Sequence, residues 1–581
     1  MLKKGIKIGM TGSINAGMQQ GTYGNRFAGF NLNNNDGTKS YYINMNYNRR
    51  NNYENVITNR LFAADSMLSQ DAFTKYTTDS YFAGYGINFF KSKKWDFEFS
   101  GNINLNNSDN YTDNLNVIKK ISASQIIASS PNIVFNKGTS LVIGNGIETK
   151  LKIDTLGSEW SNNVFYYNSH NTSEQYYSTF SQSNPSISKK GDGSGDNKRH
   201  FFSAKSDLRL KLKRRITIET GIKSTVHNYK NKTDYFLESG GGRVQDTSRT
   251  NIYDYKENIN SLYLQASKTF WKDFVIKSGA RLENTNMVGD QIVPYDTSFT
   301  LRRTDLFPYV YLSKNLMKIA GFDLKAYLVY RRTISRPVYE QLNPFPKYID
   351  EFLTEIGNPS LQPQFTKNFE ANISVDERPI LAVGLNDTKD IFSMVTYQSD
   401  TGRKQALRTY DNLGKNKEWY FRGLGAIPPG GRYFFVLGGQ YNYNIYDGLY
   451  GGQPLAFKKG TWTFFTYQTF KIDKRSVFTI NGFVRLKGQQ QLYEIGPFGM
   501  LNASINRKFM KEKLIVTLNM NDMFYSNIAN FSLKQGNVNA SGKRFGDSQR
   551  VGFNIRYNFG IRKKEENNNI FNTEIPNGNG N

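Results

Sequence analysis

The chain alternates apolar and polar positions with a period of two over most of its length, most clearly in its last stretch. One face carries Val551, Phe553, Ile555, Tyr557 and Phe559, and the other carries Gly552, Asn554, Arg556 and Asn558. This period predicts β-strands with two unlike faces. A soluble sandwich also alternates, with its apolar face inward, but repetition along the whole chain favours a membrane barrel whose apolar face is outward.

Connections between the predicted strands alternate between short and long. Short connections fall near 35–38, 92–94, 155–157, 213–214, 271–272, 316–320, 376–378, 428–431, 471–474 and 508–511. Long ones fall near 50–78, 108–137, 171–197, 231–249, 286–299, 335–363 and 525–547. Membrane barrels have short periplasmic turns and long extracellular loops. We therefore predict an all-β, antiparallel transmembrane barrel of about 22 strands over residues 1–560, with both ends periplasmic; the pattern is least regular over 388–421.

Composition agrees with a barrel and excludes helical membrane spans. Hydrophobic residues make up 38% of the chain, the mean hydropathy is −0.59, and no apolar run approaches the roughly 18 residues of a membrane helix. A barrel strand shows lipid only every second side chain, so its mean hydropathy stays low. Cysteine is absent, which excludes disulfides, thiol nucleophiles and thiolate metal sites.

The formal net charge is +26, a value that first suggests nucleic-acid binding. Lys and Arg are spread along the whole chain and do not gather on one helix or arm, so we expect no nucleic acid as a partner. Several short connections collect cations, and Trp95 and Trp271 lie beside two of them. Cations and aromatic rings suit a headgroup boundary and favour a periplasmic girdle; the alternative is that turns are polar in any protein.

No motif in the sequence indicates catalysis or a metal site. The three histidines, His170, His200 and His227, have no second ligand spaced with them. The segment 191–196 faintly resembles a calcium loop but lacks the distant Glu of that motif. A flexible extracellular loop is the better interpretation of this segment. We expect no enzyme activity, no bound metal and no cofactor.

Residues 258–370 hold a run of motifs that ends in proline-rich segments. These are Leu-Phe-Pro at 306–308, Ser-Arg-Pro at 335–337, Gln-Leu-Asn-Pro-Phe at 341–345 and Gly-Asn-Pro-Ser-Leu-Gln-Pro at 357–363. The run resembles the barrel of Bacteroidota TonB-dependent receptors, the outer membrane protein β-barrel family, and residues 518–524 resemble that family's penultimate strand. Gln364 stands where the family usually has Glu. The resemblance implies a receptor in the cell outer membrane that takes up a solute.

The prolines of this run have a structural meaning of their own. They fix φ and withhold N–H donors, so a strand must stop there and a shaped loop must begin. Glycine at 357 permits a positive φ. The family-like loop motif comprises Arg336, Pro337, Gly357, Asn358, Pro359 and Pro363. We interpret it as loop architecture at the barrel rim, with direct ligand contact as the alternative.

Receptors of this family begin with a signal peptide, a TonB box and a plug inside the barrel. Here residues 3–8 are expected to start the first strand, and residues 1–17 lack the apolar region of a signal peptide. We therefore expect this chain to lack the signal peptide and the plug domain, its true N-terminus being missing. Residues 561–581, rich in Asn, Gly and charge, are expected to form a disordered periplasmic tail.

The last strand also resembles the signal that the barrel assembly machinery recognises, through Gly552, Tyr557 and Phe559 with Arg550 and Ile555. Expected partners are outer-membrane lipid, lipopolysaccharide and this machinery; the family resemblance adds a plug domain, TonB and a surface lipoprotein. Alternative functions are a passive porin-like channel and the barrel component of a surface assembly or secretion system. The transported substrate is not indicated by the sequence.

The alternation also predicts which basic side chains line the lumen. They are Arg209, Lys211, Lys277, Arg281, Lys325, Arg331, Arg485, Lys487 and Arg556. Asp207, Glu219 and Glu283 are predicted to share that interior and to pair with some of them. The remaining excess of positive charge predicts a large pore that prefers anions when the lumen is open.

Overall fold

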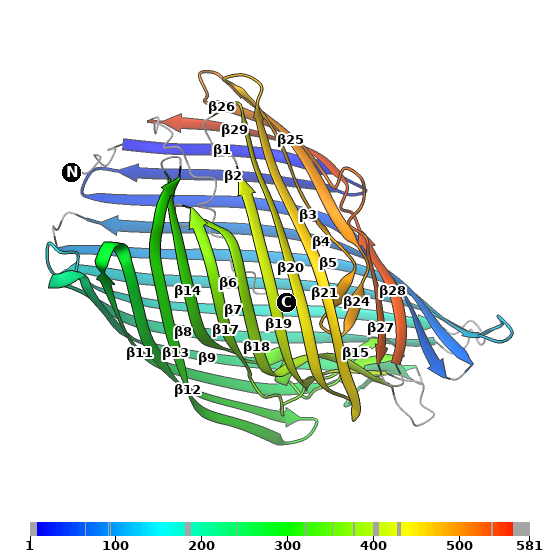
Figure 1. The fold of residues 1–581 in the computed structure, drawn as a ribbon. Helices are drawn as coiled ribbons and strands as arrows, with labels where there is room; N and C mark the ends of the chain where they lie inside the picture. The colour runs from blue at the N-terminus through cyan, green and yellow to red at the C-terminus, as the bar shows by residue number, and fades with distance from the viewer. Residues whose placement is uncertain are drawn as a thin grey trace.

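The computed structural model describes residues 9–561 apart from 64, 91, 93, 181–187, 240, 320–321, 351, 376–377, 399–405, 427–430 and 536–537. Within this part of the chain, 22 antiparallel strands form one closed barrel. Figure 1 shows β1 to β9 as one wall and the later strands crossing in front of it, as tilted strands of a barrel must. The predicted fold class and strand number are confirmed.

The first half of the barrel wall consists of β1 (Gly9–Gln20), β2 (Gly24–Asn35), β3 (Lys39–Ala63), β4 (Ser66–Phe89), β5 (Trp95–Lys120), β6 (Ile126–Lys152), β7 (Glu159–Phe180), β8 (Ser188–Leu212), β9 (Ile216–Ser239), β11 (Asn251–Phe270) and β12 (Phe274–Val293). The second half consists of β13 (Thr297–Ile319), β14 (Phe322–Ser335), β17 (Gln364–Val375), β18 (Arg378–Gln398), β19 (Ala406–Ala426), β20 (Tyr433–Tyr450), β21 (Gln453–Lys471), β22 (Ser476–Arg485), β25 (Phe498–Phe509), β26 (Leu514–Asn521) and β29 (Arg550–Gly560).

The shorter elements lie in the connections. They are the 3-10 turns η1 (Lys213–Arg215) and η2 (Trp271–Asp273), the helix α1 (Tyr339–Leu342), and the strands β10 (Gly242–Gln245), β15 (Lys347–Asp350), β16 (Leu353–Glu355), β23 (Gly488–Gln490), β24 (Tyr493–Ile495), β27 (Ala529–Gln535) and β28 (Val538–Gly546). No helix among the described residues has the length and apolar character needed to span a membrane.

The barrel closes where its first and last strands meet. β1 pairs with β29 from Thr11 opposite Gly560 to Gln20 opposite Val551. Every wall strand therefore has a neighbour on both sides, which lipid requires because it offers no hydrogen bonds to an open edge. The wall begins at Gly9 and ends at Gly560; the expected first-strand residues 3–8 and residues 562–581 of the expected tail lie outside the described residues.

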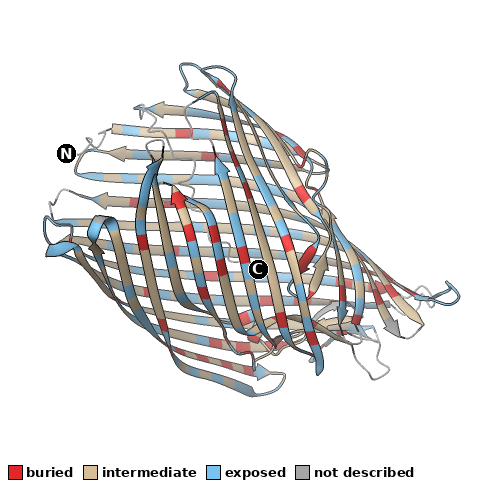
Figure 2. Cartoon of the chain, viewed as in Figure 1, coloured by how far each residue is buried: buried red, intermediate tan, exposed pale blue. Residues whose placement is uncertain are grey.

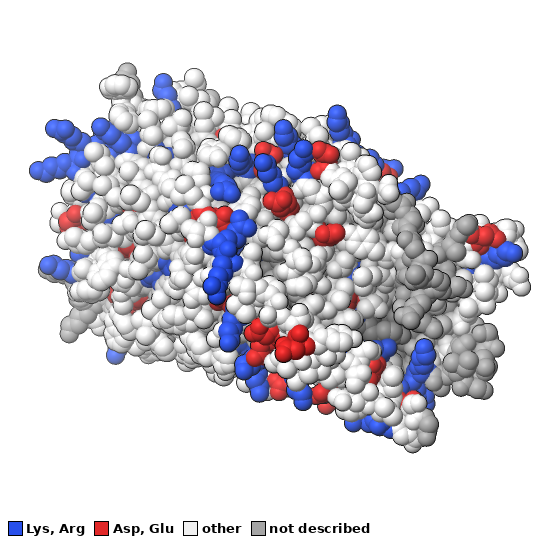
Figure 3. Space-filling model, turned by 90° about the horizontal axis from the view of Figure 1, so that it is seen from below, with Lys and Arg blue, Asp and Glu red and all other residues white. Residues whose placement is uncertain are grey.

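The predicted short connections fall between paired strands at one end of the barrel. Examples are the β2–β3, β21–β22 and β25–β26 turns, with ladders that run up to them on both sides. This end also holds the start of β1 and the end of β29, so it is the periplasmic end. Trp271 is 85% exposed in η2, and Trp95 contacts Trp160 with ring centroids 6.4 Å apart. In Figure 3, Lys and Arg stand out at this end, followed by a nearly uncharged band.

The prediction of long extracellular loops is wrong for much of the wall. β3 and β4 pair from Lys39 to Ala63 and so cross the predicted loop 50–78. The ladders of β5–β6, β7–β8 and β12–β13 likewise run through most of 108–137, 171–197 and 286–299, and the β8–β9 ladder extends into 231–249 as far as Leu237. The segment 191–196, predicted to be a flexible loop, belongs to β8 and pairs with β7 and β9.

The physical reason for this error is visible on β5. Its outward residues Phe97 and Ile103 are exposed and apolar, but beyond Leu105 the same face carries Asn107 and Asp109. Lipid demands an apolar face only within its own thickness, whereas hydrogen-bonded strands continue into water with two polar faces. Loss of alternation therefore marks the membrane boundary on this strand and not its end.

Buried residues form separate groups and not one core (Figure 2). Eight side chains, among them Val395, Tyr446 and Leu492, form one cluster, and Tyr253, Met287 and Tyr339 belong to a second. Leu68, Ile118 and Phe352 form a third. Each cluster joins wall strands to a connecting segment, so extracellular segments fold back against the inside of the wall.

Candidate functional site

The inner wall is the surface that any solute crossing the barrel would meet. Its residues follow from the register, because neighbours of exposed outward residues must point inward. Leu518, at 54% exposed, and Val484, at 41%, face outward, so Asn519 and Arg485 face inward. Following the pairings around the barrel extends this assignment to every strand.

Two parts of this wall differ in chemistry. The inner faces of β8, β9, β11, β12, β13 and β14, here called the charged wall, carry Lys205, Asp207, Arg209, Glu219, Lys223, Lys277, Arg281, Glu283, Arg303, Asp305, Lys325 and Arg331. The inner faces of β25, β26, β29 and β1–β5, here called the neutral wall because uncharged amides predominate on it, carry Asn502, Asn519, Asn554, Asn15, Asn31, Asn44, Asn46, Asn102 and Asn104. Arg556 of β29 and Glu98 of β5 are charged exceptions on the same faces.

Several predicted lumen cations are already paired with carboxylates. Arg209 Nε lies 2.8 Å from Glu219 Oε1, and its Nη1 lies 3.1 Å from Glu159 Oε1. Lys277 Nζ lies 3.3 Å from Glu219 Oε2, so one carboxylate serves two cations. The positive excess of this wall is therefore smaller than a count of Lys and Arg suggests.

Glu283 is the most buried of the shared carboxylates, at 10% side-chain exposure. Arg281 Nε approaches its Oε1 at 2.7 Å, and Arg336 Nη2 approaches its Oε2 at 2.6 Å. Arg336 also donates to Thr285 Oγ1 at 2.9 Å. The arginine of the family-like motif therefore anchors the start of its loop to the inner face of β12.

Other predicted lumen cations have no ion pair with a described residue. Arg331 donates to Asn368 Oδ1 at 3.2 Å, and Arg556 donates to Asn558 Oδ1 at 3.0 Å. Arg485 donates to Gln490 Oε1 at 2.6 Å, and no ion pair of Lys211 or Lys325 is found in the described part of the chain.

Lys487 corrects one predicted strand. The alternation extends β22 to 487, but the strand ends at Arg485 and Lys487 lies in the connection that follows. Its Nζ is 2.6 Å from Glu494 Oε1, and Lys459 of β21 binds the other oxygen of Glu494. The two ammonium groups lower the pKa of Glu494 to about 2, so this link between loop and wall persists at any physiological pH.

The connection 336–363, which holds the family-like motif, folds into the extracellular mouth. Tyr339 and Leu342 of α1 pack with Leu361 on Tyr253 and Met287 of the inner wall. Further along, Phe352 packs on Leu68 and Ile118 at the far ends of β4 and β5, and β16 pairs in parallel with β19. The segment thus crosses the mouth from one wall to another. The sequence had indicated only a shaped loop at the rim.

The motif residues hold this segment in shape. Gly357 N–H donates to Asn343 O at 2.9 Å, and Asn358 Nδ2 donates to Tyr410 O at 3.0 Å. Pro337 and Pro363 are buried, and Pro359 is half-buried. The expected positive φ at Gly357 is wrong. Glycine is needed there because a Cβ would lie 2.3 Å from Asn343 O.

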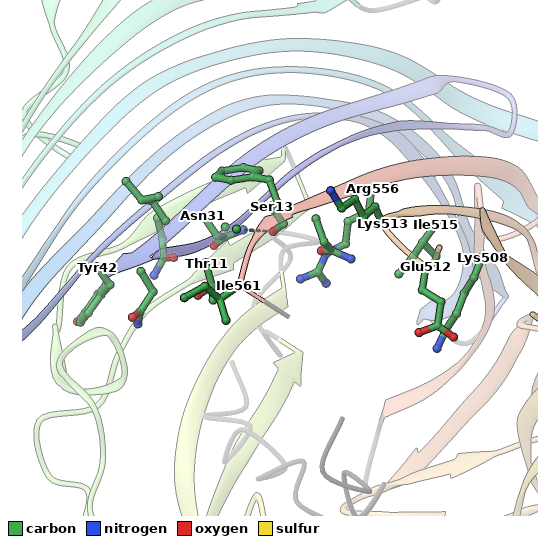
Figure 4. A pocket seen from close by; sticks show the side chains of 17 residues that line it. Thr11, Ser13, Asn31, Tyr42, Lys508, Glu512, Lys513, Ile515, Arg556 and Ile561 are labelled. Atoms are coloured by element: carbon green, nitrogen blue, oxygen red, sulfur yellow. Dashed lines mark hydrogen bonds between the residues drawn. The ribbon is translucent and has the colours of Figure 1, made fainter. Parts of the chain in front are cut away.

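Cavities open from the inner wall, and two of them contain predicted lumen residues. One of about 750 Å³ lies at the periplasmic end near the seam, with Ser13, Asn31 and Tyr42 on one side and Arg556 and Lys513 on the other (Figure 4). The second, of about 410 Å³, lies between the inner faces of β18–β22 and the connection 486–497. Arg485 lines the second cavity. Its other residues were missed because no connection was predicted between 474 and 508 that could cover them.

Comparison with known proteins identifies the family. The sequence of residues 151–557 matches the outer membrane protein beta-barrel family. This chain belongs to that family. The protein accordingly lies in the outer membrane, as predicted. No curated protein was found to match the sequence.

Solved structures agree with this family in fold. The siderophore receptor PirA from Pseudomonas aeruginosa is 12% identical with a TM-score of 0.53, covering 95% of this chain and 81% of its own. The ferripyoverdine receptor of the same species, bound to ferripyoverdine, is 12% identical with a TM-score of 0.61, covering 95% and 72%. The ferric yersiniabactin uptake receptor FyuA from Yersinia pestis is 11% identical with a TM-score of 0.61, covering 95% and 80%. At such identities the likeness shows the fold.

The expected assembly-signal residues of this outer membrane protein lie at the seam. Gly552 is packed so closely that a Cβ would meet Gln19 Cγ at 2.6 Å and Met18 O at 2.8 Å. Phe559 stacks on Phe30 with centroids 6.4 Å apart, and Tyr557 is exposed outward. These contacts close the barrel, and recognition by the assembly machinery stays a prediction.

Arg550 has a role that the sequence did not indicate. It forms a buried pair with Asp547 at 2.7 Å and donates to Tyr23 O at 3.1 Å and Asn51 O at 2.8 Å. Asp547 in turn accepts the N–H groups of Thr22 and Tyr23. This clamp ties the β1–β2 turn to the start of β29 and so fixes the seam of the family barrel at its extracellular end.

Each of the three histidines contacts a different partner. His170 Nε2 is 3.1 Å from Asp196 Oδ1, Tyr166 Oη is 2.9 Å from His200 Nδ1, and Arg199 donates to His227. Over the described ranges, no three His, Cys, Asp or Glu residues are grouped as metal ligands.

Proposed function

We propose that this chain is the barrel of an outer-membrane import receptor that takes up a solute in a TonB-dependent cycle, and that it is not an enzyme. The observation that carries the proposal is the number of strands in the barrel of this chain, taken together with its family. A barrel of 22 strands encloses more space than its own side chains fill, and barrels of this size hold a plug in their lumen.

The mouth supports the same function. Connection 336–363 crosses it, anchored by the contact of Arg336 with Glu283 and by the packing of Phe352 on Leu68. Such a segment narrows the entrance while leaving concave, polar surface around it, which suits capture of a solute from outside. We propose a plug domain as the partner that closes the lumen, TonB as the partner that moves it, and a surface lipoprotein as a further partner.

The test is nutrient uptake by cells that have or lack this gene. A deletion strain and its complemented parent are supplied with one labelled limiting nutrient at a time: a ferric chelate, a neutral oligosaccharide, a peptide or cobalamin. We expect uptake of one class to fall on deletion, to return on complementation and to stop when an ionophore collapses the proton gradient. Glucose uptake through other pores is the control.

A passive channel gives a different result in this experiment. Its uptake depends on the gene but continues after the ionophore, because diffusion needs no energy source. That outcome would contradict the proposed receptor and favour the porin-like alternative.

A further inference from the structure

Three lysines on adjoining strands form a row on the outer face of the barrel. Lys367 of β17 lies opposite Asp387 of β18, which lies opposite Lys417 of β19. On its other side, Lys417 pairs with Ile445 of β20, and Ile445 pairs with Lys458 of β21. Directly paired residues share one face of a sheet. The three lysines, here named the outer basic row, are all exposed.

The same strands carry exposed aromatic rings two residues nearer the periplasmic end. Phe369 of β17 is 47% exposed, and Trp419 of β19 is 49% exposed. Between Lys417 and Trp419, Glu418 faces the lumen, where Asn386 Nδ2 donates to its carboxylate at 2.8 Å. The rings therefore share the outer face with the outer basic row, and aromatic rings on that face mark the boundary of the apolar band.

The outer basic row stands at the extracellular boundary of that band. Lys458 lies 13 positions before Lys471, where β21 ends at its periplasmic turn. This distance is roughly 43 Å of strand, or about 30 Å of height at a tilt of about 45°, against an apolar band of about 25 Å. On the face shown in Figure 3, Lys and Arg form a further column beyond the nearly uncharged band. The row thus lies at the level of the lipid headgroups in the outer leaflet.

The charges of the outer basic row are not balanced within the wall. Its ammonium groups form no ion pair with any residue that the structure describes, and Asp387 is the one carboxylate that lies in the row between them. By contrast, Lys415, one step further out on β19, is paired, with its Nζ 3.0 Å from Asp447 Oδ2. Cations without partners at a membrane boundary attract anionic headgroups.

Apolar hollows of the outer face lie below the row. One of about 530 Å³ begins four residues below it, and Ala371, Val383 and Phe421 are part of its lining. The other, of about 820 Å³, lies beside it over β19 to β25, where Gly423 and Gly439 leave the surface without side chains. Hydrocarbon chains can fill both hollows, so a lipid whose headgroup meets the row finds room for its chains directly beneath.

We propose that the outer basic row binds the phosphates of a phosphorylated glycolipid of the outer leaflet, with its acyl chains in the two hollows. Lys417 is two strands away from each of the other lysines, roughly 10 Å. The row therefore offers separate cations to a headgroup with more than one phosphate, whereas a phospholipid headgroup has one phosphate and engages one lysine. An ammonium group donates up to three hydrogen bonds and binds phosphate as a point charge. This inference goes beyond the proposed function, because lipid binding on the outer face needs no solute in the lumen.

Native mass spectrometry of the full chain, refolded in a neutral detergent, measures this binding directly. The added lipids are bisphosphorylated lipid A, the same lipid A without its phosphates, and phosphatidylglycerol, which is anionic with one phosphate. We expect saturable binding of bisphosphorylated lipid A and at least about tenfold weaker binding of the other two, since each lysine near an anionic headgroup contributes roughly fivefold.

Two triple variants remove the same charge from opposite faces of the wall. The outer variant carries Lys367→Gln, Lys417→Gln and Lys458→Gln. The lumen variant carries Lys211→Gln, Lys223→Gln and Lys325→Gln. We expect the outer variant to bind bisphosphorylated lipid A at least about tenfold more weakly. The lumen variant should stay within about twofold of the unaltered chain, because its charges lie across the wall and are screened. Melting temperatures show that each variant is folded.

The proposal is overturned if bisphosphorylated lipid A does not bind saturably, if either of the other lipids binds as tightly, or if the two triple variants bind alike. Should the outer variant not refold, Lys417→Gln alone decides: about fivefold weaker binding supports the proposal, and unchanged binding overturns it. The measurement involves no solute and no proton gradient. Failure of lipid binding therefore contradicts this inference alone, and failure of uptake in cells contradicts the proposed receptor alone.

Discussion

On the charged wall, carboxylates lie beside the cations they balance, whereas on the neutral wall asparagines face other amides and hydroxyls. Glu219 serves both Arg209 and Lys277, while Asn502 Nδ2 donates to Asn481 Oδ1 at 3.0 Å and Asn31 Nδ2 to Ser13 Oγ at 3.4 Å. Both arrangements pair inward polar groups with neighbours on the same wall, because the lumen is too wide for side chains to meet across it.

The difference shows how strongly the side chains of each wall depend on their partners. An amide carries its own donors and acceptor, so losing one neighbour leaves a modest deficit. An ion pair depends on a specific opposite charge, and removing that charge leaves the other stranded. The mouth segment is anchored on the charged wall through Arg336, so the fragile chemistry lies where the barrel holds its entrance.

The largest expected effect comes from Glu283→Ala. It strands Arg281 and Arg336 together, and the loss in the free energy of unfolding is expected to be about 3–5 kcal/mol, the usual cost of breaking a buried pair. Denaturant titration of the folded barrel in detergent measures it. Glu283→Gln, which keeps the shape and hydrogen-bonding capacity, is expected to lose less; equal losses would show that charge is not the cause.

The comparison of the two walls depends on which residues of each strand face lipid and which face the lumen. The variant Leu518→Arg tests this assignment on β26. Leu518 faces lipid near the middle of β26, and Arg at such a site costs about 2–4 kcal/mol. Asn519→Arg on the neutral wall is expected to cost much less, because its side chain enters the lumen. Refolding titrations of both variants compare them, and similar costs would mean that the faces are assigned wrongly.

Asn502→Ala is expected to have a smaller effect on the neutral wall. It removes the bond to Asn481 and the acceptor for Asp522 N–H at 2.9 Å, a loss of about 1–2 kcal/mol. Repeating the titration at low and high salt sharpens the contrast, since the loss at Asn502 should not change while that at Glu283 should shrink. A salt-dependent loss at Asn502 would contradict the neutral character of this wall.

The smallest expected effect is on ion selectivity. The chain in planar bilayers is expected to prefer anions modestly, because Arg331 and Arg556 have no carboxylate partner in the described part of the chain while Arg209 and Arg281 do. Arg331→Gln should shift the reversal potential toward cations, and Lys223→Gln offers a second site on the same wall. A cation-selective unaltered chain would sink the charge argument.

Strand order and the periplasmic turns could be predicted because each depends on neighbouring residues. The alternation of 551–559 survives as β29, and the cation-rich turn near 213–214 appears as η1. The extensions of β3 to β9 could not be predicted, because a strand in water needs no apolar face and its ladder leaves no period in one sequence. The length of these strands is set by their pairing with neighbouring strands, and the alternation of apolar and polar residues does not indicate that pairing.

The candidate sites depended on distant contacts in the same way. Arg336 was recognised as part of a motif, but its partner Glu283 is 53 residues away and was assigned only to the lumen. Arg485 was assigned to the lumen, but its contacts with Gln489 and Gln490 arise only when connection 486–497 folds over the wall. The prolines of 337–363 indicated that a loop begins, and the packing of Phe352 on β4 and β5 decided where it goes.

The length of the strands has a further consequence at the cell surface. β6 has 27 residues, about 90 Å of strand at roughly 3.3 Å per residue, and even a tilt of about 45° leaves it about 60 Å tall against an apolar band of about 25 Å. More than half of this strand therefore stands clear of the hydrocarbon, at the height of the polysaccharide chains outside the cell. An antibody or a phage tail fibre arriving from outside meets this polar collar before it meets the bacterium's lipid.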